Sequence, residues 1–204
     1  MKELSDIEYI RMRSFMFVGS VKTNSLEYWS NYYFLMTCII ECSRIFQQKY
    51  QCNTDILFDS AENSITLTSS AYCIPHEYLL DYSTKLEQDG ESFQEHWFIT
   101  ALNALSSYFV IKSCNNGKER QLTFEKGELK DDISSENQDM YELSIHFVPD
   151  KELFPTFQLK KELLEDWANQ YAYLCPGHTI TLNGKDICHT EGMKNFIDNL
   201  KFAA

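Results

Sequence analysis

Long apolar segments are absent from the 204-residue sequence. The longest apolar run, residues 32–40, already contains Thr37 and is far shorter than the roughly 20 residues that cross a bilayer. Residues 1–6 are polar and lack the apolar stretch of a signal peptide. We therefore expect a cytoplasmic protein that does not enter a membrane.

Cysteine and histidine spacings typical of metal sites are absent as well. The seven cysteines include no Cys-x-x-Cys pair, and the gap between Cys38 and Cys42 suits one helix face better than a zinc site. The five histidines lie on different predicted elements without metal-ligand spacing. We therefore expect no metal site, and reduced thiols that are mostly buried.

Positive charge is scarce, because 18 Lys and Arg stand against 30 Asp and Glu, for a formal net charge of −12. In residues 55–95 the only positive side chain is Lys85. The carboxylates of this segment are Asp55, Asp59, Glu62, Glu77, Asp81, Glu87, Asp89, Glu91 and Glu95. Such a surface repels nucleic acid and anionic lipid and attracts a basic partner. We take Asp81, Glu87, Asp89, Glu91 and Glu95 as the candidate partner surface; the alternative is a solubilising face.

The composition of 44% hydrophobic and 14% aromatic residues is typical of an ordered globular protein. Apolar residues recur with helical period in residues 26–48, 93–107 and 160–174. We also expect a short helix and loop in residues 75–92 and a short terminal helix in residues 192–200.

Strand signals fill the segments between these helices. We predict hairpins from residues 55–58 with 64–68, 108–114 with 120–124, and 178–182 with 187–189. Residues 141–148 alternate like a half-buried strand, whereas residues 126–139 are polar and predict a mobile loop. No repeat or linker divides residues 1–204, so we predict one α+β domain with helices against a mixed sheet.

Four segments, in this order, carry a resemblance to a known family. Residues 8–19 resemble Val-Arg-Lys-Arg-Pro-Gly-Met-Tyr-Ile-Gly, and residues 102–106 repeat Val-Asn-Ala-Leu-Ser with one change. Residues 116–127 resemble the hairpin that follows, and residues 191–200 are similar to Gly-Gly-Leu-x-x-Phe-Val-x-x-Leu. The family patterns named here belong to the N-terminal ATPase domain of DNA gyrase B and topoisomerase IV, which this chain therefore resembles. The resemblance implies a GHKL (Bergerat-like) sandwich, with helices on one face of a mixed, mainly antiparallel sheet.

The nucleotide-binding positions implied by this resemblance carry other residues. The glutamate that serves the family as general base falls at Cys38, and the magnesium-binding asparagine falls at Cys42. The adenine-binding aspartate falls at Ser69, and the glycines after it fall at Ala71 and Cys73. A thiol is a poor base for water at neutral pH and a poor ligand for magnesium, which prefers oxygen.

The glycine-rich lid of the family aligns with residues 92–98, which contain no glycine and end in Phe98. The Gly-Thr pair that precedes a family strand becomes Glu142-Leu143. Phosphate binding at a helix N-terminus needs glycines, because backbone N–H groups must approach the oxygens. The resemblance therefore implies a protein that binds no ATP or other cofactor and is not an enzyme, with its former pocket filled by side chains.

These observations favour a non-catalytic binding module. One version regulates a topoisomerase or another nucleic-acid enzyme, and the other is an immunity-type antidote to a basic toxin. The alternatives are a small-molecule binder that has repurposed the cleft, a residual ATPase, and a thiol nucleophile at Cys73. Because the chain ends about where the first subdomain of the family ends, we expect no transducer domain.

Overall fold

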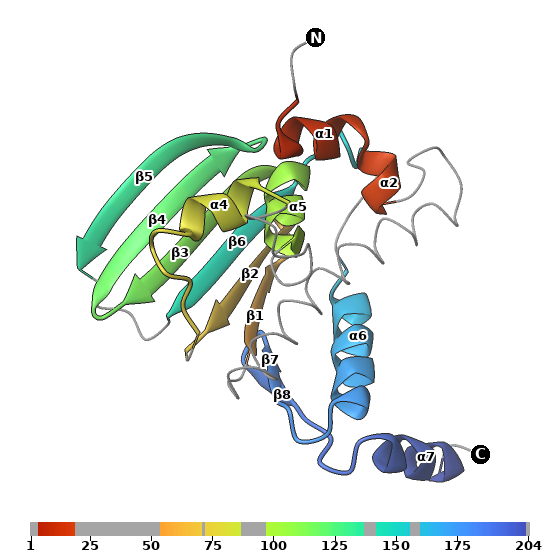
Figure 1. The fold of residues 1–204 in the computed structure, drawn as a ribbon. Coiled ribbons are helices and arrows are strands. Elements are labelled where there is room, and N and C mark those ends of the chain that lie inside the picture. The colour runs from red at the N-terminus through yellow and green to blue at the C-terminus, as the bar shows by residue number, and fades with distance from the viewer. Residues whose placement is uncertain are drawn as a thin grey trace.

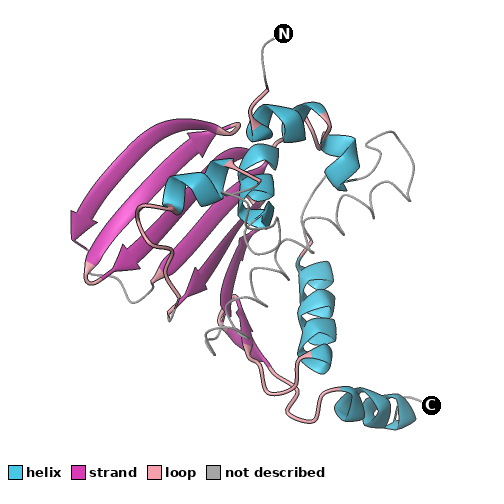
Figure 2. Ribbon diagram, in the orientation of Figure 1, coloured by secondary structure: helices cyan, strands magenta, loops and turns pink. Residues whose placement is uncertain are grey.

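The computed structural model describes residues 4–18, 54–70, 72–86, 97–136, 142–155 and 160–202. In these residues, helices cover one face of an eight-stranded sheet of order β5-β4-β3-β6-β2-β1-β7-β8 (Figure 1). Every strand pair is antiparallel except β1 with β7, which run parallel. The predicted α+β class, with helices on one face of a mixed, mainly antiparallel sheet, is confirmed (Figure 2).

The strands are β1 Thr54–Asp59, β2 Ser64–Ser69, β3 Ser106–Asn115, β4 Lys118–Glu125, β5 Glu128–Glu136, β6 Leu143–Pro149, β7 Ile180–Leu182 and β8 Lys185–Ile187. The helices are α1 Asp6–Met12, α2 Ser14–Val18, α4 Leu79–Thr84, α5 Trp97–Leu105, α6 Lys161–Leu174 and α7 Met193–Phe202. In this described part of the chain, no helix is long and apolar enough to span a membrane.

The core lies between the sheet and the helices in front of it in Figure 1. Leu143, Ile145 and Phe147 of β6 are all fully buried and point to the same side, because alternate residues of a strand share a face. Every residue of α5 from Phe98 to Leu105 is buried. α5 is therefore the central helix of the described core.

The predicted hairpins are confirmed, and their turns explain why the sequence indicates them so clearly. Asn116 and Gly117, between β3 and β4, have φ of 54° and 74°. Asn183 and Gly184, between β7 and β8, have φ of 48° and 78°. Two successive positive φ values are those of the tight hairpin turn that Asn-Gly favours. The helices predicted at residues 93–107, 160–174 and 192–200 appear as α5, α6 and α7; the helix predicted at residues 26–48 lies outside the described residues.

The prediction of a mobile loop at residues 126–139 is wrong, because residues 128–136 form strand β5. All nine residues of β5 are exposed, so no side chain needs to be apolar and the strand has no alternating pattern. Its strand conformation comes from the ladder with β4 and from the turn at Lys126 and Gly127, whose φ values are 49° and 82°.

Helix α1 was not predicted, although the sequence carries a capping signal for it. The Glu8 N–H donates to Ser5 Oγ at 3.2 Å, and the Ser5 N–H donates to Glu8 Oε2 at 2.9 Å. This reciprocal capping box satisfies N–H groups that would otherwise lack partners at the helix start. The buried side of α1 presents Ile7 to the backbone of Gly127, so the helix closes over the β4–β5 turn.

Candidate functional site

The segment that follows β2 is held against the sheet by Ser113, a fully buried residue of β3. Ser113 Oγ accepts a hydrogen bond from the Ile74 N–H at 2.9 Å and donates one to the Ile74 carbonyl oxygen at 2.6 Å. His76 Nε2 donates to the Ser113 carbonyl oxygen at 2.9 Å. Residues 74–76 are therefore fixed over β3.

Arg120 of β4 also holds the segment of residues 74–76, at His76. Its Nη1 donates to the His76 carbonyl oxygen, while Nε and Nη2 donate to the two carboxylate oxygens of Asp132 at 2.9 and 2.7 Å. The hydrogen bond to Asp132 raises the pKa of Arg120, and the same bond lowers the pKa of Asp132. Charge-assisted forked pairs of this kind have a specific geometry. Strands β3, β4 and β5 thus jointly position the segment.

The described positions that the resemblance assigns to the nucleotide pocket are largely buried. Ser69 and Phe98 are 1% exposed, and Leu143 is 0% exposed. Ser69 lies opposite Leu143 in the β2–β6 register, and its carbonyl oxygen accepts from the Glu142 N–H at 2.9 Å. Three further candidates, Cys38, Cys42 and Ala71, lie outside the described residues.

Cys73, the remaining candidate at this pocket, is partly exposed beside the fixed segment. Burial raises the pKa of its thiol, and nearby Glu142 and Cys114 raise it further. A thiol that stays protonated at neutral pH is a poor nucleophile and a poor base, because the thiolate is the reactive form. This electrostatic environment argues against the alternative in which Cys73 is a nucleophile.

Helix α5 begins where the resemblance places the end of the lid. Buried polar side chains of α5 form hydrogen bonds to α4 and to the residue that follows it. Thr100 Oγ1 lies 2.7 Å from the Lys85 carbonyl oxygen and 3.0 Å from that of Tyr82. Asn103 Nδ2 donates to the Ser83 carbonyl oxygen at 2.8 Å. The two helices form one packed unit.

Tyr72 and Phe98 belong to the same hydrophobic core, and Trp97 packs against it.

The candidate acidic surface is described at only one of its residues, Asp81, since Glu87, Glu91, Asp89 and Glu95 lie outside the described residues. Asp81 stands on α4 and pairs with Lys85 at 2.8 Å. Asp55 is exposed, and its neighbour Ile56 faces the helices, so Asp55 points to the opposite side of the sheet. The described carboxylates of residues 55–95 therefore do not form one continuous patch.

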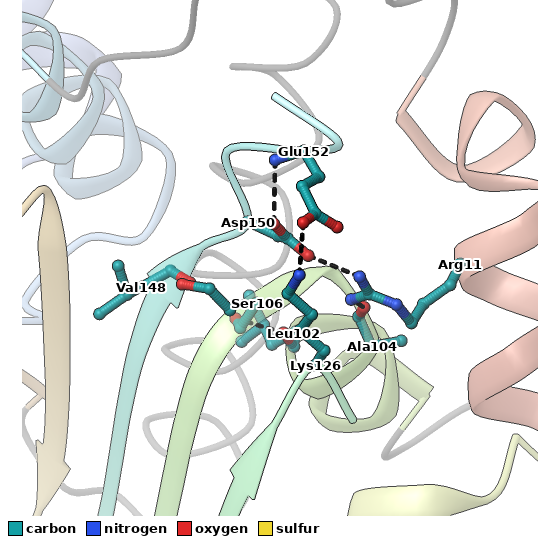
Figure 3. A network of polar contacts seen from close by, with 9 residues as sticks. Arg11, Leu102, Ala104, Ser106, Lys126, Val148, Asp150 and Glu152 are labelled. Carbon is teal, nitrogen blue, oxygen red and sulfur yellow. Dashed lines mark hydrogen bonds and ion pairs between the residues drawn. The ribbon is translucent and has the colours of Figure 1, made fainter. Parts of the chain in front are cut away.

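A polar network at the end of β6 was not found by sequence reasoning (Figure 3). Arg11 of α1 donates from Nη1 to the Ala104 carbonyl oxygen at 2.6 Å and from Nη2 to Asp150 Oδ2 at 2.5 Å. Asp150 is 1% exposed, and its Oδ1 accepts from the Glu152 N–H at 2.9 Å. Arg11 lies in a segment that carries the resemblance, but no pattern in the sequence connects it with Asp150.

Among the described residues, no group of three or more His, Cys, Asp or Glu could hold a metal ion. Four described candidates of the former pocket, Ser69, Cys73, Phe98 and Leu143, carry a hydroxyl, a thiol, a phenyl ring and an isobutyl group. None of these is a carboxylate or an amide, the groups that the resemblance assigns to adenine and magnesium binding. The described part of this site is a packed core beside a fixed surface segment.

Comparison with known proteins finds a significant curated relative, whereas no family model matches the chain. The relative, the B subunit of DNA topoisomerase 4 from Borreliella burgdorferi, is 26% identical over 206 residues, covering 96% of this chain. The aligned region is 34% of that relative, so the chain spans about a third of its length.

Solved structures share the fold over nearly the whole chain. The B-subunit of DNA gyrase from Myxococcus xanthus superposes with a TM-score of 0.77 at 17% identity, covering 97% of this chain and 60% of that one. The 43K ATPase domain of Thermus thermophilus gyrase B, solved with an aminocoumarin, gives 0.74 at 18% identity, covering 97% and 55%. The resemblance seen in the sequence is confirmed: the chain is similar in sequence to a B subunit of topoisomerase IV and has the fold of gyrase B ATPase domains.

Proposed function

We propose that this chain is a non-catalytic gyrase-B-like domain that acts in the cytoplasm by binding a basic protein partner. It does so without ATP, a metal or another cofactor, and without contacting nucleic acid or membrane directly. The observation that carries the proposal is the burial of Phe98 and Leu143, at 1% and 0% exposure, in positions that the resemblance assigns to the lid and to the strand beside it.

The physical argument concerns space and polarity. A triphosphate needs backbone N–H groups at close approach and oxygen ligands for its magnesium. At the lid position a core phenylalanine replaces a glycine, and at the strand position a leucine side chain offers no hydrogen bond. Ser69, which the resemblance places at the adenine-binding aspartate, is 1% exposed.

Two versions of the partner-binding role follow from the homology and the charge. Homology to topoisomerase subunits favours a regulator of a topoisomerase or another nucleic-acid enzyme, since such a domain can occupy the contacts of its relative. The net charge of −12 equally suits an immunity-type antidote to a basic toxin, because complementary charge speeds association. The two versions share one prediction, which is a basic partner.

Nucleotide binding is tested by titration calorimetry with a non-hydrolysable ATP analogue and magnesium. A gyrase B ATPase domain measured in parallel shows that the analogue is competent. We expect no heat of binding from this chain, because the positions for base, metal and phosphate lack their groups. A micromolar affinity would overturn the proposal.

Partner binding is tested by capture from the native host, followed by kinetics with the purified partner. The variant D81K/E87K/D89K/E91K should associate far more slowly, with a difference that shrinks as salt rises, because the field reaches only about 8 Å at physiological ionic strength. An on-rate indifferent to both the substitutions and salt would show that this segment is a solvated face.

A further inference from the structure

Among the residues that the structure describes, strand β5 is an edge of the sheet. It lies at one end of the strand order, where β4 flanks it on one side only (Figure 1). All nine of its residues are exposed. Alternate residues of an edge strand direct their N–H and C=O groups away from the sheet, and these groups can pair with another chain. The other edge, β8, has only three residues.

The side chains of β5 define the charge of a chain that could pair there. Its four carboxylates and one lysine give the strand a formal charge of −3. Two of the four carboxylates are already paired within the hairpin, since Asp132 pairs with Arg120 at 2.7 Å and Glu128 with Lys130 at 2.9 Å. Asp131 and Glu136 remain exposed along the edge.

Apolar contact is available beside these charges. Ile133, opposite Gln121 in the register, is 52% exposed, and Leu129 is 43% exposed. A pairing strand would cover such side chains while its own basic groups meet the carboxylates. A second copy of β5 would instead place one strand of charge −3 against another, which is unfavourable, because like charges directly opposite in a ladder destabilise it.

We propose that β5 accepts an extended basic segment of a partner protein as an added antiparallel or parallel strand. The inference rests on the proposed partner-binding function and names the binding edge and the chemistry of the ligand. Backbone hydrogen bonds supply the pairing, and alternating basic side chains supply the selectivity. This edge is made of other residues than the candidate acidic surface of residues 81–95, because β5 spans residues 128–136.

The test uses a synthetic nine-residue peptide in which lysine alternates with valine or threonine, titrated into the ¹⁵N-labelled full chain. We expect shifts and slowed amide exchange confined to β5 and its neighbour β4. Two further peptides carry N-methyl groups on one or the other set of alternate amides. One of them should lose binding, because its methyl groups would face β5; a peptide held by charge alone would bind equally in all three forms.

The variant D131K/S135K changes the charge of β5 from −3 to 0 without touching Asp132. We expect it to weaken peptide binding by about tenfold or more at low salt, with a smaller difference at high salt, because the attraction is screened. The matched control D166K/Q170K adds the same charge on the exposed face of α6, and we expect it to bind like the parent chain.

The outcomes separate this inference from the function on which it rests. Shifts centred on α4, equal affinity for D131K/S135K, or no peptide binding at all would overturn the inference about β5. A parent chain that dimerises in sedimentation, with the dimer abolished by D131K/S135K, would identify a second copy as the occupant and would also overturn it. Binding of the ATP analogue with the peptide still seated on β5 would overturn the proposed function alone.

Discussion

Replacement of Arg11 by methionine should destabilise the fold more than any exposed charge change. Methionine has a flexible apolar side chain, shorter than that of arginine, and provides no charge and no donor. The substitution removes the ion pair to Asp150 and the hydrogen bond to the Ala104 carbonyl oxygen (Figure 3). Asp150 would keep the Glu152 N–H as a partner and would lose its counter-charge.

The expected magnitude follows from the burial of the two partners. The side chain of Asp150 is 2% exposed and that of Arg11 is 19% exposed. Breaking a buried pair costs roughly 3–5 kcal/mol, because it leaves an uncompensated charge in the interior. Since Arg11 reaches solvent, we expect the lower end, about 3 kcal/mol, which for a chain of this size lowers Tm by about 6–12 °C.

Urea denaturation and calorimetry of four proteins would measure this effect: the parent chain, R11M, D150N and R11M/D150N. The double variant should lose less stability than the two single variants together, because no unpaired charge remains in it. The matched control is K126M, which breaks the exposed ion pair of Lys126 with Glu152 and should cost no more than about 1 kcal/mol. R11M as stable as K126M, or full additivity in the double variant, would refute the reasoning.

Three further predictions concern single residues. G127A should lower the free energy of unfolding more than G117A in the same urea assay. Both glycines have positive φ, but only at Gly127 would an added Cβ overlap Ile7. Equal losses would show that α1 can shift away from the added Cβ at little cost. Alkylation of Cys73, followed by mass spectrometry against pH, should have its midpoint above the ordinary pKa of 9.0, and a midpoint at or below 9.0 would contradict the effect of burial. Burial lowers the pKa of His146 below its ordinary value of 6.5, so the unfolded chain binds the proton more readily than the folded chain. The free energy of unfolding should therefore fall as pH drops below about 6.5. The variant H146Q should flatten this pH dependence, and an unchanged profile would assign the dependence to other groups.

Local signals in the sequence were sufficient to predict most of the elements. Asn116 and Gly117 indicate their hairpin because few other residue pairs adopt two positive φ values at low cost. The alternation of Leu143, Ile145 and Phe147 predicts β6, because one face of that strand is buried. The four segments of the resemblance predicted the GHKL fold, since they occur in this chain in the same order as in the family.

The candidate sites depended more on contacts between distant residues. Arg11 and Asp150 are 139 residues apart, and Ile74 and Ser113 are 39 apart. No local pattern connects such pairs, because the fold alone brings them together. The polar replacements in the former pocket were visible in the sequence, but the burial of Phe98 and Leu143 required the packing of α5 against the sheet.

Strand β5 shows most clearly the difference between what local sequence predicts and what the fold decides. Its nine residues carry charges on both faces and are all exposed, so the sequence by itself predicted a loop. The ladder to β4 and the turn at Gly127 make it a strand, because backbone hydrogen bonds need no apolar side chains. The sequence by itself therefore determined the resemblance, the turns and the half-buried elements. Only the tertiary structure decided that β5 is an edge of the described sheet, since an edge is defined by the strands beside it.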